Sequence, residues 1–157
     1  MTTRYAKEAL VVVHPSSIDS FFWHAREARG APWARDECEN LADEIVRAAG
    51  AHPVVAVIDQ GWDGDCAEAL RSRLRELPST IWIAHDEDAD GWDALRASLP
   101  AILRDAGAAS AKLAGFWFDG CVRAVAEILQ QAGMPARIDS DLCGHELDED
   151  DYSADPG

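Results

Sequence analysis

Five short apolar runs are spaced along the chain, and none shows the polar alternation of a strand that faces water on one side. Valine, isoleucine, leucine and tryptophan are frequent in these runs, which is typical of parallel strands buried on both faces. The runs are Ala9–Val13, Val54–Ile58, Thr80–Ala84, Leu113–Trp117 and Ala136–Ile138. We therefore expect five buried strands.

Between these runs, apolar residues recur every three or four positions, which predicts amphipathic helices. The predicted helices are Glu37–Ala49, a segment from Asp63 or Asp65 to Leu77, a segment from Trp92 to Leu103, and Gly120–Ala132. Asp36 and Glu39 form a variant of the capping box at the start of the first helix, and Gly50 is expected to end it. Pro100 is expected to bend or divide the third helix.

The order of strands and helices predicts an α/β fold of the Rossmann-like kind, a three-layer sandwich. A single, mostly parallel sheet of five or six strands would carry helices on both faces. We expect one domain over residues 1–145 and an acidic C-terminal tail over residues 146–157. Ser16–Arg35 interrupts the regular order, and we interpret it as a long loop. Its aromatic residues favour an ordered lid or an oligomer contact.

The composition narrows the expected partners. The formal net charge is −15, which argues against nucleic acid because its phosphates would be repelled. The apolar runs are too short to cross a membrane and the first residues do not resemble a secretory leader, so we expect a cytoplasmic protein without a membrane partner. No glycine-rich nucleotide loop occurs, and no cofactor is expected. The expected partners are a small-molecule substrate or ligand and further copies of the chain in a homo-oligomer.

Residues capable of chemistry follow all five predicted strands, with Asp139, Asp141 and Cys143 after the fifth, and the candidate catalytic residues follow the first four. His14 follows the first, Asp59 the second and His85 the third, while Asp119 and Cys121 follow the fourth. Ligands and substrates of open parallel sheets bind at the carboxyl ends of the strands. These five residues are therefore the candidate catalytic residues.

Cys121 is the candidate nucleophile. Asp119 is a suitable N-cap for the following helix, which would place the thiol in its first turn, where the helix dipole favours a thiolate. His14 or His85 would serve as acid and base in a Cys–His pair, with Asp59 or Asp86 orienting the imidazole. The other three cysteines are expected to pack as small buried hydrophobic residues.

Other interpretations of these residues stay open. Cys121 would have no chemical role if it only packs in the fold, and each histidine would then cap a strand end or face water. His14, Asp59 and His85 also have the ligand types of a zinc or iron site, although their spacing is not diagnostic and no metal is expected.

The stretch Ala114–Gly133 resembles the signature of the isochorismatase-like cysteine hydrolases, an apolar strand that ends in Ala-Gly, a short turn with Asp, and Cys-Val opening a helix. This resemblance implies a cysteine nucleophile, which Cys121 matches, assisted by an Asp after the first strand and a Lys after the third. His14 stands in place of that Asp, and His85-Asp86 stands where the Lys is expected. The metal-binding Asp-x-His arrangement of the nicotinamidases in this family is missing.

The leading hypothesis is a divergent isochorismatase-like cysteine hydrolase that acts on a small amide or ester through a Cys121 thiolate. Backbone N–H groups at the start of the same helix would hold the oxyanion. The alternative is a catalytically inactive relative that binds a small ligand or serves in an assembly, because both charged helper residues of the family are replaced.

Overall fold

The computed structural model describes residues 7–78 and 80–145, and the expected acidic tail at 146–157 lies outside them. The strands are β1 (Lys7–Val13), β2 (Val54–Asp59), β3 (Thr80–Ala84), β4 (Ala108–Phe116) and β5 (Ala136–Gly144). The helices are α1 (Ile18–Arg29), α2 (Ala31–Ala51), α3 (Asp65–Arg75), α4 (Ala89–Asp105) and α5 (Cys121–Gln131), and a short 3₁₀ helix, η1 (Pro15–Ser17), follows β1.

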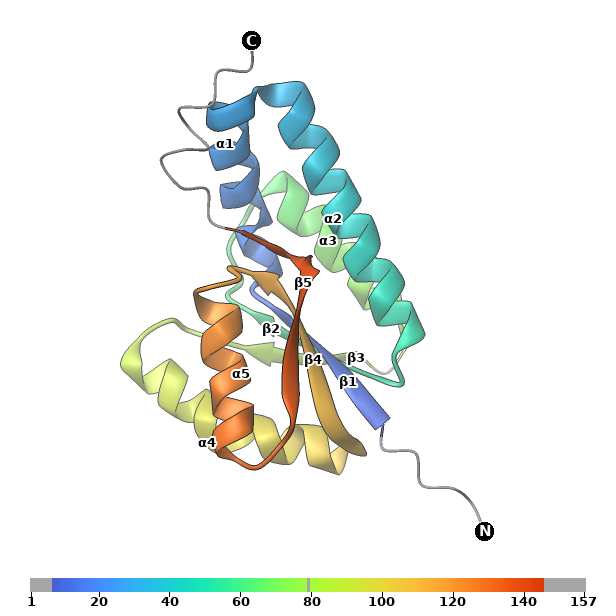
Figure 1. Cartoon of the computed structure of the whole chain (residues 1–157), viewed down its shortest axis with the longest axis vertical. Helices are drawn as coiled ribbons and strands as arrows, with labels where there is room; N and C mark the ends of the chain where they lie inside the picture. The colour runs from blue at the N-terminus through green and yellow to red at the C-terminus, as the bar shows by residue number, and fades with distance from the viewer. Residues whose placement is uncertain (1–6, 79, 146–157) are drawn as a thin grey trace.

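The five strands form one parallel sheet in the order β3-β2-β1-β4-β5 (Figure 1). β1 is central, and its last residue, Val13, is in register with Ile58 of β2 and Gly115 of β4. The chain builds the sheet outward from β1 to β3 and then returns to the other side of β1 to add β4 and β5. The strand order therefore reverses beside β1, which is where such sheets open a crevice for a ligand.

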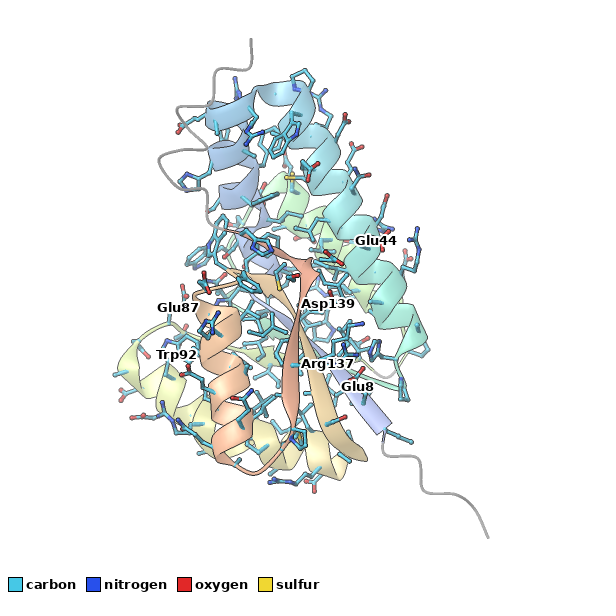
Figure 2. The ribbon with its side chains drawn as sticks, in the orientation of Figure 1. Glu8, Glu44, Glu87, Trp92, Arg137 and Asp139 are labelled. Carbon is cyan, nitrogen blue, oxygen red and sulfur yellow. The ribbon has the colours of Figure 1, made fainter. Side chains whose placement is uncertain are left out.

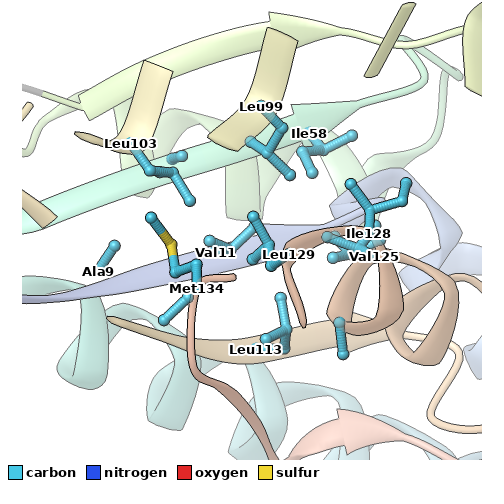
Figure 3. Close-up of a cluster of buried hydrophobic side chains, with 14 of the residues drawn as sticks. Ala9, Val11, Ile58, Leu99, Leu103, Leu113, Val125, Ile128, Leu129 and Met134 are labelled. Atoms are coloured by element: carbon cyan, nitrogen blue, oxygen red, sulfur yellow. The ribbon is translucent and has the colours of Figure 1, made fainter. Parts of the chain in front are cut away.

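The side chains of β1 alternate between two apolar layers. Val11 and Val13 lie in the layer of α4 and α5, where Figure 3 shows Val11 near Leu99 and Leu129. Leu10 points the opposite way, into a layer built from α1, α2 and α3. Helices thus cover both faces of the sheet, and the expected three-layer α/β sandwich is confirmed.

The prediction of a long loop at Ser16–Arg35 is wrong. The segment forms η1, then α1, and after Gly30 the first turns of α2. Ile18, Phe21, Ala25 and Ala28 are the buried residues of α1, and their spacing of three and four positions is helical. Charged residues between the aromatic ones hide this pattern in the sequence. The buried face packs α1 against α2 and α3, and Ile18 and Phe21 at its start join the apolar layer beside the sheet.

Helix boundaries elsewhere follow the sequence with two corrections. α3, α4 and α5 lie where their apolar periodicity predicts them. α2 is longer than expected, because it runs from Ala31 to Ala51 with Asp36 and Gly50 inside it rather than at its ends. Pro100 lies inside α4 without dividing it.

No helix among the described residues has the combination of length and apolar character that a membrane crossing requires.

Candidate functional site

A buried histidine stands at the carboxyl end of the central strand. His14 follows β1 directly, is only 1% exposed, and has a φ of 51°, a left-handed conformation that is uncommon for a residue with a side chain. Its backbone N–H donates to the carbonyl of Ile58 at 2.8 Å, which fixes it against β2. Unusual backbone conformations of this kind are concentrated at functional sites.

His85, which follows β3, forms a pair with His14. The Nε2 atom of His14 lies 2.8 Å from the Nδ1 atom of His85, so one imidazole donates a hydrogen bond to the other. The indole of Trp92 covers His85 edge to face, with ring centroids 4.5 Å apart. Burial lowers the pKa of His14 to about 4, and burial also lowers the pKa of His85. Both imidazoles are therefore uncharged near neutral pH.

Glu87 brings a carboxylate to this pair, and the sequence analysis did not select it. Its Oε1 atom lies 3.5 Å from Nδ1 of His14, and its Oε2 atom accepts a hydrogen bond from Nε2 of Gln60 at 2.7 Å. Gln60 is held in turn by the hydroxyls of Ser16 and Ser17, each 3.1 Å from its Oε1 atom. Side chains that follow β1 and β2 therefore fix the position of the Glu87 carboxylate.

Cys121 completes the cluster from the other side of β1. It is the first residue of α5, and its Sγ donates a hydrogen bond to Oε1 of Glu87 at 3.2 Å. Gly115 allows β4 to approach β1 here, because a Cβ atom at this position would overlap the carbonyl oxygen of Val13. The strand order and this close approach bring Cys121 to the carboxyl ends of the strands, where His14 also lies.

Two of the backbone groups expected to form an oxyanion hole are already engaged. The N–H groups of Gly120 and Val122 both donate to the carbonyl of Trp117, at 3.0 and 3.2 Å. An oxyanion could use these donors only after the turn before α5 rearranges. In this conformation the start of α5 positions the sulfur but offers neither of these two N–H groups to a substrate.

Asp119 and Asp59 do not have the positions that the sequence predicted. Asp119 is exposed and pairs with Arg123 at 2.6 Å, and the N-cap of α5 is Gly120 without a side-chain hydrogen bond. Asp59 does not orient either imidazole, because its carboxylate binds the buried guanidinium of Arg71 at 3.0 Å. A hydrogen bond from a charged guanidinium stabilises a carboxylate more than one from a neutral imidazole does.

The remaining cysteines differ from Cys121 in their surroundings. Cys38 and Cys143 are buried, and burial raises the pKa of each thiol to about 12. Cys66 is half-buried, and its pKa is also raised by burial and by the nearby Asp19. The prediction of buried packing roles is therefore confirmed for Cys38 and Cys143.

Three of these side chains have the chemistry and the spacing of metal ligands. One ligand atom each from His14, Glu87 and Cys121 lies within 4.8 Å of the other two. The set considered from the sequence combined His14 with Asp59 and His85, but Asp59 binds Arg71 and the two imidazoles bind each other.

There is also space beside the histidine pair. His85 lines a cavity of about 430 Å³ that continues over the first turns of α4, past Asp88 and Gly91. Figure 2 shows Glu87 and Trp92 on the side of the sheet that α4 and α5 cover. A small molecule could therefore approach His85 from this side.

Comparisons of the chain with protein-family models, curated proteins and solved structures found no match. The resemblance of Ala114–Gly133 to the isochorismatase-like signature thus rests on the sequence pattern alone. The geometry brings together His14, His85 and Cys121 from the predicted set, and adds Glu87. Glu87 lies three residues after the end of β3, and this position is the feature of the sequence that could have made it a candidate.

Proposed function

We propose that the chain is a cysteine hydrolase of small amides or esters, in which Cys121 is the nucleophile and Glu87 accepts its proton. The observation that carries this proposal is the 3.2 Å hydrogen bond from Sγ of Cys121 to Oε1 of Glu87. Covalent catalysis requires a nucleophile and a base within hydrogen-bond reach. The pair also lies at the carboxyl ends of the strands, where ligands of open parallel sheets bind.

The reaction would proceed in two steps. In the first, the thiol proton of Cys121 moves to Glu87 while Sγ attacks the substrate carbonyl carbon, and the bond to the leaving nitrogen or oxygen breaks as that atom takes the proton from Glu87. In the second, Glu87 takes a proton from water, the resulting hydroxide attacks the thioester, and the acid product leaves as Sγ regains the proton. The chain is unchanged after the two steps.

The surrounding residues position this pair. Gln60 donates to Oε2 of Glu87, which leaves Oε1 for the thiol and for Nδ1 of His14. His85 fixes the ring of His14 through their shared hydrogen bond. The thiol bonds to Glu87, whereas the two histidines bond to each other, so we give the proton transfer to Glu87 and assign the histidines positioning roles.

The sequence resemblance supports the proposal with one change of position. The family pattern places its carboxylate after the first strand, where this chain has His14. Here a carboxylate reaches the cysteine from Glu87, which follows β3. A carboxylate beside the nucleophile is thus kept, although it comes from the segment where the family has its Lys.

The engaged N–H groups of Gly120 and Val122 favour a second candidate function, a non-catalytic protein that binds a small ligand in the same crevice.

For either function we propose a cytoplasmic homo-oligomer. Trp23 and Trp62, which are 54% and 49% exposed, are the large apolar side chains that a second copy would cover.

Turnover of p-nitrophenyl acetate by the full chain separates the two functions. We expect Cys121→Ala to abolish turnover with an unchanged circular dichroism spectrum. Cys66→Ala, which removes a half-buried thiol from another part of the fold, should retain turnover. Equal turnover by the native chain and Cys121→Ala would refute the hydrolase and leave the binding protein.

A further inference from the structure

Three ligand atoms from three separate segments converge at the crevice. They are Nδ1 of His14 after β1, a carboxylate oxygen of Glu87 after β3, and Sγ of Cys121 at the start of α5. We propose that these three side chains bind a zinc-type divalent cation and leave its fourth coordination position open. This inference concerns the metal-binding capacity of the crevice and goes beyond the proposed hydrolase.

The separations of the three atoms fit one small cation. Zinc lies about 2.0 Å from nitrogen and oxygen ligands and about 2.3 Å from sulfur, so tetrahedral ligand atoms lie roughly 3.3–3.5 Å from each other. Here Oε1 of Glu87 is 3.5 Å from Nδ1 of His14 and 3.2 Å from Sγ of Cys121. All three atoms lie within 4.8 Å of one another, so only a small closing movement between His14 and Cys121 is needed.

The chemistry of the ligands selects the class of metal. A thiolate and an imidazole favour zinc and similar borderline cations, whereas magnesium and calcium require oxygen ligands. Binding would release the thiol proton of Cys121 to solvent, because the thiolate is the form that binds the metal. A thiolate and the Glu87 carboxylate would together neutralise the two positive charges of the cation.

The residues that would bind the metal are themselves held by hydrogen bonds, as is usual in metal sites of proteins. A metal-binding histidine usually uses its second nitrogen in a hydrogen bond that fixes the ring, and Nε2 of His14 is bound to Nδ1 of His85 at 2.8 Å. The second oxygen of Glu87 is held by Nε2 of Gln60 at 2.7 Å. His85 itself is buried, and its Nε2 atom has no hydrogen-bond partner among the described residues.

A bound cation would occupy the same sulfur that the proposed hydrolase uses as its nucleophile. Zinc at this site would therefore inhibit thioester formation at Cys121. Metal binding is measured without substrate, so failure of the hydrolase proposal does not decide this inference, and failure of this inference leaves the hydrolase proposal standing.

Cobalt(II) is the probe, added to the full chain after treatment with a chelator. We expect one cobalt per chain, with a thiolate-to-cobalt charge-transfer band in the near ultraviolet. Cys121→Ser should lose this band, while the matched control Cys66→Ser should keep it. Loss of a contact behind a ligand already costs about 10- to 100-fold in metal affinity, so Glu87→Gln, which changes a ligand, should weaken cobalt binding at least about 100-fold.

The inference would be overturned by the absence of a thiolate–cobalt band in the native chain, by the same band in Cys121→Ser, or by its loss in Cys66→Ser. Circular dichroism shows whether each variant is folded. If Cys121→Ser does not fold, Glu87→Gln decides, because its side chain is 32% exposed and the change preserves its shape. Unchanged cobalt affinity in folded Glu87→Gln would contradict the proposal.

Discussion

The thiol of Cys121 lies 3.2 Å from the carboxylate of Glu87, although the two residues are 34 positions apart in the chain. The contact depends on the strand order, because β3 and β4 lie on opposite sides of β1. Glu87 must cross the end of β1 to reach the sulfur, and Gln60 and His14 hold it there. The site is thus a product of the fold as a whole.

Replacing Glu87 with Gln should reduce turnover of p-nitrophenyl acetate by about 100- to 10,000-fold, the usual contribution of a general base. The amide keeps the shape of the side chain but cannot accept a proton. Glu44→Gln is the matched control, because Glu44 is exposed on α2 and pairs with Arg47 of the same helix. Unchanged turnover in Glu87→Gln, measured at the same pH, would contradict the assigned role of Glu87.

The buried thiols should resist alkylation. Burial raises the pKa of Cys38 and Cys143 to about 12, above the ordinary thiol value of about 8.5. Because only the thiolate reacts, both should stay unmodified by iodoacetamide in the folded chain at about pH 8 and react once urea unfolds it. Peptide mass spectrometry gives the extent at each site. Modification of Cys38 in the folded chain at the rate seen in urea would show that the prediction is wrong.

Gly115→Ala should destabilise the fold strongly. The residue has a φ of 117°, and a Cβ atom there would overlap the Val13 carbonyl, so β1 and β4 would have to separate. Gly30→Ala is the control, since Gly30 has a φ of 94° but open space around it. With φ 94° and ψ 158°, Gly30 lies in a backbone region that is essentially restricted to glycine, so the control should lose about 1–3 kcal/mol from backbone strain alone. Urea unfolding should show a larger loss for Gly115→Ala, and equal losses would refute the close approach.

Asp19→Ala should weaken the start of α3. The carboxylate of Asp19, in the first turn of α1, accepts the N–H groups of Cys66 and Ala67 at 3.1 and 2.8 Å. The N-cap residue of α3, Gly64, has no side chain to do this. We expect a loss of about 0.5–2 kcal/mol in the free energy of unfolding, and partial recovery in Asp19→Asn. Stability equal to that of the native chain would show that the cap contributes nothing.

The sequence was sufficient to locate the five strands and three of the helices. It was also sufficient to place the site at the carboxyl ends of the strands. Uninterrupted apolar runs located β1, β2 and β4, which are largely buried, but the expectation of burial is wrong for the edge strands β3 and β5, which are only partly covered. The rule of carboxyl ends selected His14, His85 and Cys121. Asp119 was predicted as the N-cap of α5 because aspartate often caps helices. In the structure the N-cap is Gly120, and Asp119 forms an ion pair with Arg123.

Glu87 could not be predicted in the same way. It lies among four consecutive residues with ionisable side chains, His85 to Asp88, and local sequence does not show which of them faces Cys121. Asp88 caps α4 by accepting the N–H of Gly91, and Glu87 is held by Gln60, which follows β2. Such long-range contacts decide the site and leave no periodic signal.

The most direct test is to trap the acyl intermediate. The full chain is mixed with p-nitrophenyl acetate, quenched in acid at successive times and digested, and acetyl groups are located by peptide mass spectrometry. We predict a burst of nitrophenolate matched by acetyl on Cys121, which then declines as the thioester is hydrolysed. Acetyl groups absent from Cys121, or no more frequent there than on Cys66, would contradict Cys121 as the nucleophile.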